Sequence, residues 1–171
     1  MNIIALDLGS QTGWASRCGG VINSGTKSFA LTKYEGRGMQ FLKFKRFLMH
    51  LTEMVKPEFI ALEEVRRHLG TDAAHAYGGY LSHVSSYCAE AEIPHVGVAV
   101  GTIKKHATGK GNANKEQMVE AAKKQYPTQE IEDDNQADAL MLLSYAIQEI
   151  ACPDWTELPG WAKSSTFAIK R

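Results

Sequence analysis

MNIIALDLGSQTGWA, residues 1–15, opens on an apolar run of the kind that forms a buried strand, and the run ends at a carboxylate, Asp7. The chain then breaks into Gly9, Ser10 and Gly13, where a strand would stop. A protein core rejects an isolated charge, and burying one without a partner costs several kcal/mol. Asp7 therefore either hydrogen-bonds within its own turn or faces something cationic.

The segments that follow extend this strand into a mixed α/β sheet. Residues 13–20 and 20–30 predict two more strands joined at a Gly-Gly turn, which gives a three-stranded antiparallel meander. Helices and strands then alternate, which is typical of parallel strands with helices on both faces of the sheet. The expected elements are strands at 58–65 and 94–100 and helices at 33–55, 71–92, 101–109, 115–125 and 133–150. We expect one domain over 1–150 and a C-terminal tail, 151–171, that packs on it or is mobile.

The composition is that of an ordinary globular protein. Of 171 residues, 44% are hydrophobic and 22% are charged, and no apolar run reaches the roughly 18 residues of a membrane span. The first residues lack the basic segment and cleavage site of a signal peptide. Cys18, Cys88 and Cys152 are odd in number and have no metal-binding spacing, which indicates a reducing, cytoplasmic compartment. We therefore expect no membrane partner.

The net charge is zero, but the charges are unevenly distributed along the chain. Acidic residues collect in 129–138, and basic residues collect in three other segments. The basic clusters are Lys33, Arg37, Lys43, Lys45 and Arg46; Arg66, Arg67 and His68; and Lys104, Lys105, Lys110 and Lys115. This pattern predicts either a basic face beside an acidic pocket or an ordinary solvated surface.

Carboxylates stand at the boundaries of the expected elements. Asp7 ends the first strand, and Glu63 lies near the end of the strand at 58–65. Asp134 and Asp138 lie one helical turn apart at the start of the last helix. Neighbouring carboxylates repel one another unless a cation neutralises them. Oxygen ligands with few histidines nearby favour Mg²⁺ or Mn²⁺ over zinc, and two such ions about 4 Å apart can promote phosphodiester hydrolysis. The glycines after Asp7 are expected to let a substrate phosphate approach closely.

Each of these carboxylates also has a structural role open to it. Glu63 could pair with a nearby arginine. Asp134 could complement the dipole at the N-terminus of its helix, and Asp133 could cap that helix. Asp138 lies in the second helical turn, where no cap is needed, so its position favours a functional role.

Other residues are expected to pack. Met39 and Met54 recur at helical spacing and are expected in the core. Tyr77 and Tyr80 could stack on a splayed base, although packing against the sheet or against a partner subunit is favoured. The small residues around them suit close approach of another helix.

Four motifs occur in the order and spacing of one protein family. They are IIALDLGSQTGWA (3–15), IALEEV (60–65), KKHATGKGNANKEQM (104–118) and DDNQADALML (133–142). Together they resemble the RuvC family of Holliday junction resolvases, most of all its phage-encoded members, over about residues 1–149. The resemblance implies a ribonuclease H-like fold, a homodimer and two-metal cleavage of DNA at branch points.

The resemblance also implies roles for individual residues. Asp7, Glu63 and Asp138 match the family's acidic ligands, which would hold two Mg²⁺ per site, with Mn²⁺ able to substitute. Three residues before the last aspartate the family usually has Asp or His, whereas this chain has Asn135, and we expect Asp134 to supply the missing carboxylate. The basic residues expected to contact DNA are Lys104, Lys105, Lys110, Lys115 and Arg66.

These observations predict a crossover junction endodeoxyribonuclease that acts on four-way junctions, flaps or forks, in the cytoplasm of a bacterial host if it is phage-encoded. A nuclease-inactive protein that binds branched DNA is the alternative, because Asn135 brings no charge. A phosphate-loop ATPase of the actin or sugar-kinase type shares the D-x-G-x-x-x-G opening. It would need two related domains and a second nucleotide-binding motif, for which 171 residues leave no room.

Overall fold

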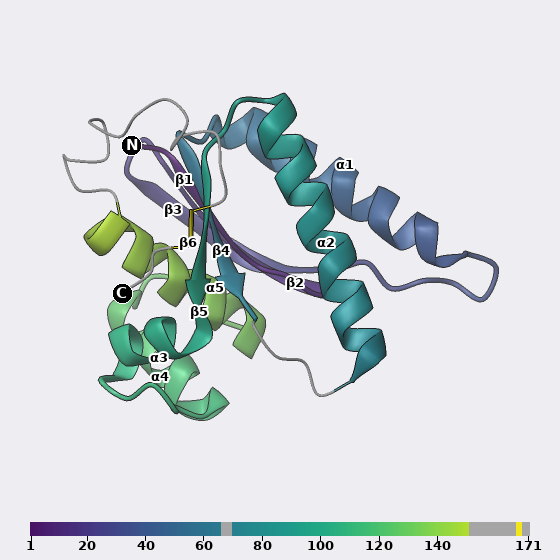
Figure 1. The fold of residues 1–171 in the computed structure, drawn as a ribbon. Helices are drawn as coiled ribbons and strands as arrows, with labels where there is room; N and C mark the ends of the chain where they lie inside the picture. The colour runs from purple at the N-terminus through teal and green to yellow at the C-terminus, as the bar shows by residue number, and fades with distance from the viewer. Residues whose placement is uncertain (66–69, 151–166, 169–171) are drawn as a thin grey trace.

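The computed structural model describes residues 1–65, 70–150 and 167–168. Its centre is a mixed sheet with the strand order β3-β2-β1-β4-β5-β6 (Figure 1). The strands are β1 (Ile3–Asp7), β2 (Gln11–Cys18), β3 (Val21–Ser28), β4 (Phe59–Glu64), β5 (His95–Ala99) and β6 (Phe167–Ala168). The first three strands pair antiparallel, and β1, β4, β5 and β6 pair in parallel. The predicted meander followed by parallel strands is confirmed.

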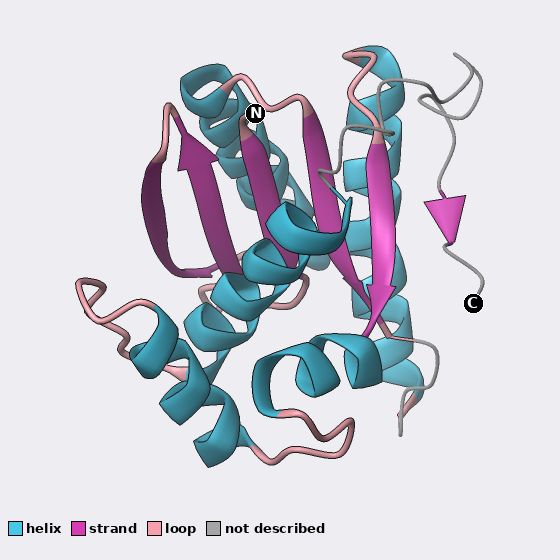
Figure 2. Ribbon diagram, turned by 90° about the vertical axis from the view of Figure 1, so that its left-hand side faces the viewer, coloured by secondary structure: helices cyan, strands magenta, loops and turns pink. Residues whose placement is uncertain are grey.

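Helices cover both faces of the sheet. One layer consists of α1 (Arg37–Val55) and α2 (Thr71–Glu90). The other consists of α3 (Val100–Thr108), α4 (Lys115–Gln125) and α5 (Asp134–Tyr145), and α5 continues into the π-helical turn η1 (Ala146–Ile150). Figure 2 shows α5 crossing in front of the sheet while α1 and α2 lie behind it.

The sequence of β1 explains its central position. Ile3 and Ala5 point into the core shared with α5, whereas Ile4 and Leu6 point into the core shared with α1 and α2, as the alternation of side chains along a strand requires. All four side chains are inaccessible to solvent. A strand covered on both faces is apolar without interruption, so Asp7 stands where β1 leaves the core.

Two details of α1 differ from the prediction. The helix begins at Arg37 rather than near residue 33, because Gly36 is extended and the residues before it form a turn. Met39 and Met54 were expected in the core, and this is wrong: both are exposed, Met54 to 67%. The buried stripe of the helix passes along its other side, through Phe44 and the residues one and two turns later.

The remaining predictions about the ends of the chain are partly tested. The last helical segment reaches Ile150, the last residue of this described stretch. The expected tail, 151–171, lies outside the described residues apart from β6. No helix among residues 1–65 and 70–150 is long and apolar enough to cross a membrane.

Candidate active site

β1 and β4 end side by side at one edge of the sheet. Their parallel register pairs Leu6 with Leu62, so the next residue of each strand, Asp7 and Glu63, stands at the same level. Their two carboxyl groups are close enough to change each other's pKa. The predicted proximity of Asp7 and Glu63 is therefore present in the structure.

The start of α5 packs on the strand beside Asp7. Gly13 of β2 lies opposite Asp7 in the antiparallel register. The backbone carbonyl of Asn135 lies so close to Gly13 that a β-carbon there would overlap it. The expectation that the glycines admit a substrate phosphate is therefore wrong for Gly13, which instead admits the protein's own helix.

Asp133 holds the start of α5 in place. Its side chain accepts a hydrogen bond of 2.8 Å from the backbone N–H of Gln136, as an N-cap does. It also accepts one of 2.6 Å from the Thr26 hydroxyl on β3. The same carboxylate thus caps α5 and fastens it to the meander, which confirms the structural role open to Asp133.

The carboxyl groups at this edge are buried and change one another's pKa. Burial raises the pKa of Asp7 well above its usual value, and the neighbouring Glu63 and Asp134 raise it further. Burial also raises the pKa of Glu63; the neighbouring Asp7 lowers it, and the charge of Asp138 raises it. Burial and then the charge of Asp7 raise the pKa of Asp138 to about 7. These side chains form one electrostatic unit, whose ionised form is costly without a cation.

The chemistry of this unit fits a hard divalent cation. Within the described residues, Asp138 Oδ1 is buried and has no hydrogen-bond partner, which costs free energy unless a donor or a cation satisfies it. An all-carboxylate set of donors suits Mg²⁺ or Mn²⁺. Among residues 1–65 and 70–150, no three Asp, Glu, His or Cys side chains are already arranged as a metal site.

Lys104 lies at the carboxylates. Its ammonium group donates a hydrogen bond of 2.7 Å to the carbonyl of Ala113, in the loop after α3. Its positive charge lowers the pKa values of Glu63 and Asp138, and so opposes part of the increase that burial causes. The structure therefore places this predicted DNA contact beside the acidic edge.

Lys115, at the start of α4, reaches the same edge through Asp134. The two side chains form a hydrogen-bonded ion pair, and Lys115 lowers the pKa of Asp134. Asp134 is in turn close enough to raise the pKa values of Asp7 and Asp138. Asp134 thus joins the acidic edge, as the sequence predicts, but from its rim and with a lysine as partner.

Two of the other predicted DNA contacts, Lys105 and Lys110, lie farther out. Lys105 is exposed, one residue along α3 from Lys104. Lys110 lines a pocket of about 610 Å³ between α3 and α4, together with Lys124. Arg66 lies outside the described residues.

Tyr77 is a residue of this site that the sequence assigned to packing or base stacking. Its hydroxyl group donates a hydrogen bond of 2.9 Å to the carbonyl of Glu63 and accepts one of 3.3 Å from the N–H of Val65. It thereby fixes the backbone on both sides of Glu64, directly after the residue that carries the Glu63 side chain. A tyrosine with one polar tip on an otherwise small-residue helix face is the signal that indicates such a role.

Comparison with solved structures identifies the fold. No family model matches the sequence, and no curated protein sequence does. The chain is similar to Thermus thermophilus RuvC in complex with a Holliday junction substrate, with a TM-score of 0.70 and 19% identity over 83% of this chain and 90% of that one. Another structure of T. thermophilus RuvC gives a TM-score of 0.69 and 19% identity over 86% and 96% of the two chains. The yeast mitochondrial Holliday junction resolvase gives 0.54 and 15% identity over 95% and 78%. This chain therefore has the α/β fold of the RuvC resolvases, the ribonuclease H-like fold that its four motifs predict.

Proposed function

We propose that this protein is a divalent-metal-dependent endonuclease that cleaves branched DNA, with the four-way junction as its main substrate. One observation carries the proposal: Asp7, Glu63 and Asp138 come from three separate elements and bury mutually repelling carboxyl groups at one edge of the sheet. Such a cluster weakens a fold that could pack apolar side chains instead, so a function must retain it. The similarity to a RuvC structure solved with a Holliday junction substrate supports branched DNA as the target.

Asp7, Glu63 and Asp138, with Asp134 at the rim, are the residues that would hold two Mg²⁺ or Mn²⁺. Two such ions would activate a water molecule and stabilise the leaving oxygen. The protein's own part is to fix its carboxylates on rigid elements. Strand pairing sets Asp7 and Glu63 at one level, and the contact between Gly13 and α5 brings the helix to them.

Lys104 and Lys115 are the residues that we assign to the scissile strand. The Lys115 side chain is 77% exposed although it pairs with Asp134, so it can exchange that carboxylate for a substrate phosphate. Lys104 brings positive charge to the inner side of the same edge. Together they reduce the repulsion between a polyanionic substrate and an acidic site. Binding should accordingly weaken as the salt concentration rises.

We further propose that the protein acts as a homodimer. A two-fold symmetric dimer presents two equivalent sites, which matches the two-fold symmetry of a four-way junction. Each site would cut one strand and leave a 5′-phosphate end.

The test is single-turnover cleavage of an end-labelled four-way junction, with linear duplex and a 5′-flap as comparison substrates. The protein should cut the junction in Mg²⁺ or Mn²⁺ and not in EDTA. Asp7→Asn should bind the junction like the wild type but cut it at least 100-fold more slowly, since an amide is a poor ligand for these ions. Binding without cutting in any divalent ion would favour the nuclease-inactive alternative. Nucleotide hydrolysis without strand cleavage would favour an ATPase.

A further inference from the structure

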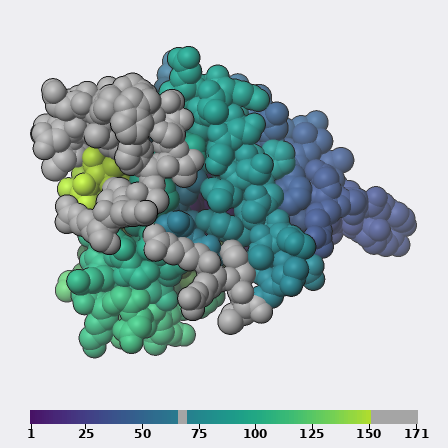
Figure 3. Space-filling model, in the orientation of Figure 1, coloured from purple at the N-terminus to yellow at the C-terminus, as the bar shows by residue number. Residues whose placement is uncertain are grey.

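Residues 29–36, between β3 and α1, form an arm that projects from the body of the protein. In Figure 1 the arm is the loop at the far right, and in Figure 3 the same blue-purple end stands clear of the other elements. The arm carries Tyr34, which is 86% exposed, more than any other large hydrophobic residue in the described part of the chain. The ammonium group of Lys33 lies over the Tyr34 ring, 4.8 Å from its centroid. An aromatic ring and a cation are thus presented together at an outer surface.

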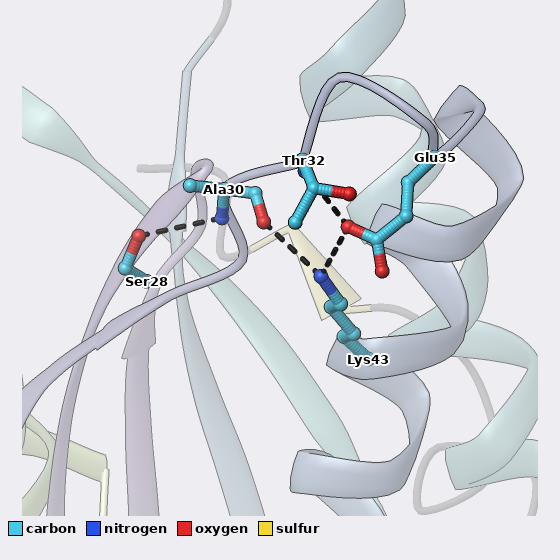
Figure 4. A network of polar contacts seen from close by, with 5 residues as sticks. All are labelled: Ser28, Ala30, Thr32, Glu35 and Lys43. Atoms are coloured by element: carbon cyan, nitrogen blue, oxygen red, sulfur yellow. Dashed lines mark hydrogen bonds and ion pairs between the residues drawn. The ribbon is translucent and has the colours of Figure 1, made fainter.

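A polar network holds the arm in this shape (Figure 4). Glu35 Oε2 accepts hydrogen bonds of 2.8 Å from the N–H of Thr32 and from the ammonium group of Lys43 on α1. Lys43 also donates to the carbonyl of Ala30, at 3.2 Å. The ion pair with Lys43 lowers the pKa of Glu35. The ring of Tyr34 is therefore carried on a loop that is tied to α1 at both of its ends.

The base of the arm is joined to the loop that follows Asp7. The N–H of Phe29 donates a hydrogen bond of 2.8 Å to the carbonyl of Ser10. The Phe29 ring is buried against Phe44 and Tyr80, with ring centroids 5.4 Å and 6.2 Å away. The arm thus leaves the sheet at the same edge that carries the carboxylates.

The charge of this region is strongly biased. The whole chain has 19 basic and 19 acidic residues. Within residues 27–46, however, Glu35 is the one acidic residue, and it is already paired with Lys43. The basic residues of this stretch are Lys27, Lys33, Arg37, Lys43, Lys45 and Arg46. Such an excess of positive charge complements a phosphate backbone.

We propose that the arm is a second DNA-contacting element, in which Tyr34 stacks on a base left unpaired at a branch point while Lys33, Lys45 and Arg46 contact the flanking phosphates. This inference rests on the proposed action on branched DNA. A base has a π-face whatever its identity, so stacking of this kind recognises an opened branch rather than a sequence. Because the loop is already held in one shape, it loses little conformational entropy when it binds a ligand.

The test uses a four-way junction that carries 2-aminopurine beside the branch point. Wild-type protein should change the 2-aminopurine fluorescence on binding, in Ca²⁺ or EDTA so that no cutting occurs. Tyr34→Ala should abolish that change and weaken junction binding about tenfold, within the range found for loss of one base–aromatic stack. Tyr34→Phe keeps the ring and should behave like the wild type. Met54→Ala is the matched control, since Met54 is an exposed apolar residue at the other end of α1.

The affinity for linear duplex and the melting temperature distinguish a loss of stacking from a loss of folding or of general DNA binding. Tyr34→Ala should not change the affinity for linear duplex or the melting temperature, because the side chain is exposed. The inference is overturned if Tyr34→Ala binds the junction and perturbs 2-aminopurine as the wild type does, or if it changes the oligomeric state instead. If wild-type protein shows no preference for branched DNA over duplex, the proposed function fails as well.

Discussion

The backbone carbonyl of Asn135 occupies the space that a β-carbon on Gly13 would need. Because Gly13 pairs with Asp7 across the first two strands, this contact determines how close α5 comes to the end of β1. The acidic edge therefore depends on a residue that has no side chain and takes no part in chemistry.

Gly13→Ala should push the start of α5 away from β2. The added methyl group meets main-chain atoms that cannot rotate aside, so we expect a loss of about 1–3 kcal/mol in the free energy of unfolding and a large loss of junction cleavage. Chemical denaturation and single-turnover kinetics measure the two effects. Gly78→Ala is the control, because a β-carbon there meets nothing within 4 Å; it should raise stability slightly, as Ala does in a helix. Wild-type stability in Gly13→Ala would show that α5 does not depend on this contact.

The acidic edge should make the metal-free protein less stable as the pH rises. The pKa of Asp138 is raised from 3.8 to about 7. At a pH between these two values, Asp138 therefore keeps its proton in the folded protein and loses it in the unfolded chain. The contribution of Asp138 is therefore favourable at low pH and disappears as the pH approaches 7. Asp138→Asn should flatten the pH dependence of the melting temperature over this range.

Metal binding should reverse that loss. Mg²⁺ binds ionised carboxylates, so it should raise the melting temperature by several degrees at pH 8 and by much less at pH 5. Differential scanning calorimetry with and without Mg²⁺ measures both shifts. An equal effect of Mg²⁺ at both pH values, unchanged in Asp138→Asn, would place the bound ions elsewhere.

Two adjacent aspartates should have opposite phenotypes. Asp133 caps α5 and binds Thr26, so Asp133→Ala should cost about 1 kcal/mol of stability and leave the affinity for Mn²⁺ unchanged. Asp134 stands at the rim with Lys115, so Asp134→Ala should weaken Mn²⁺ binding with little loss of stability. Isothermal titration with Mn²⁺ and thermal denaturation separate the two. The assignment of Asp134 to the metal fails if its variant binds Mn²⁺ as tightly as the wild type.

Neighbouring lysines of α3 provide a second matched pair. Lys104 acts on Glu63 and Asp138, so Lys104→Met should slow cleavage of bound junction by 10-fold or more. Lys105 is exposed on the next position of the helix. Lys105→Met should weaken binding and reduce its salt dependence by about one phosphate contact without slowing the cut. Equal loss of cleavage rate in both variants would contradict the placement of Lys104 at the reacting strand.

The sequence predicts those parts of the site that follow from strand register and helical period. The apolar run before Asp7 and the run before Glu63 each identify a central strand, and parallel pairing then places both carboxylates at one edge. The spacing of Asp134 and Asp138 places both on one face of α5. The resemblance to RuvC adds which of these acids act together.

Contacts between distant segments could not be predicted in the same way. The glycine pattern after Asp7 is the same whether Gly13 faces a phosphate or a helix, and the structure shows the helix. The hydrogen bonds of Tyr77 to the backbone around Glu63 depend on how α2 lies against β4. The exposure of Met39 and Met54 depends on the rotation of α1 about its axis, which helical spacing leaves free when apolar residues occur on both sides.

The most direct measurement is the anomalous scattering of a crystal grown with Mn²⁺. We expect peaks at the shared edge of β1, β4 and α5, with oxygen atoms of Asp7, Glu63 and Asp138 drawn to within about 2.2 Å of an ion. Crystals saturated with Mn²⁺ whose peaks all lie away from these three side chains would contradict the account.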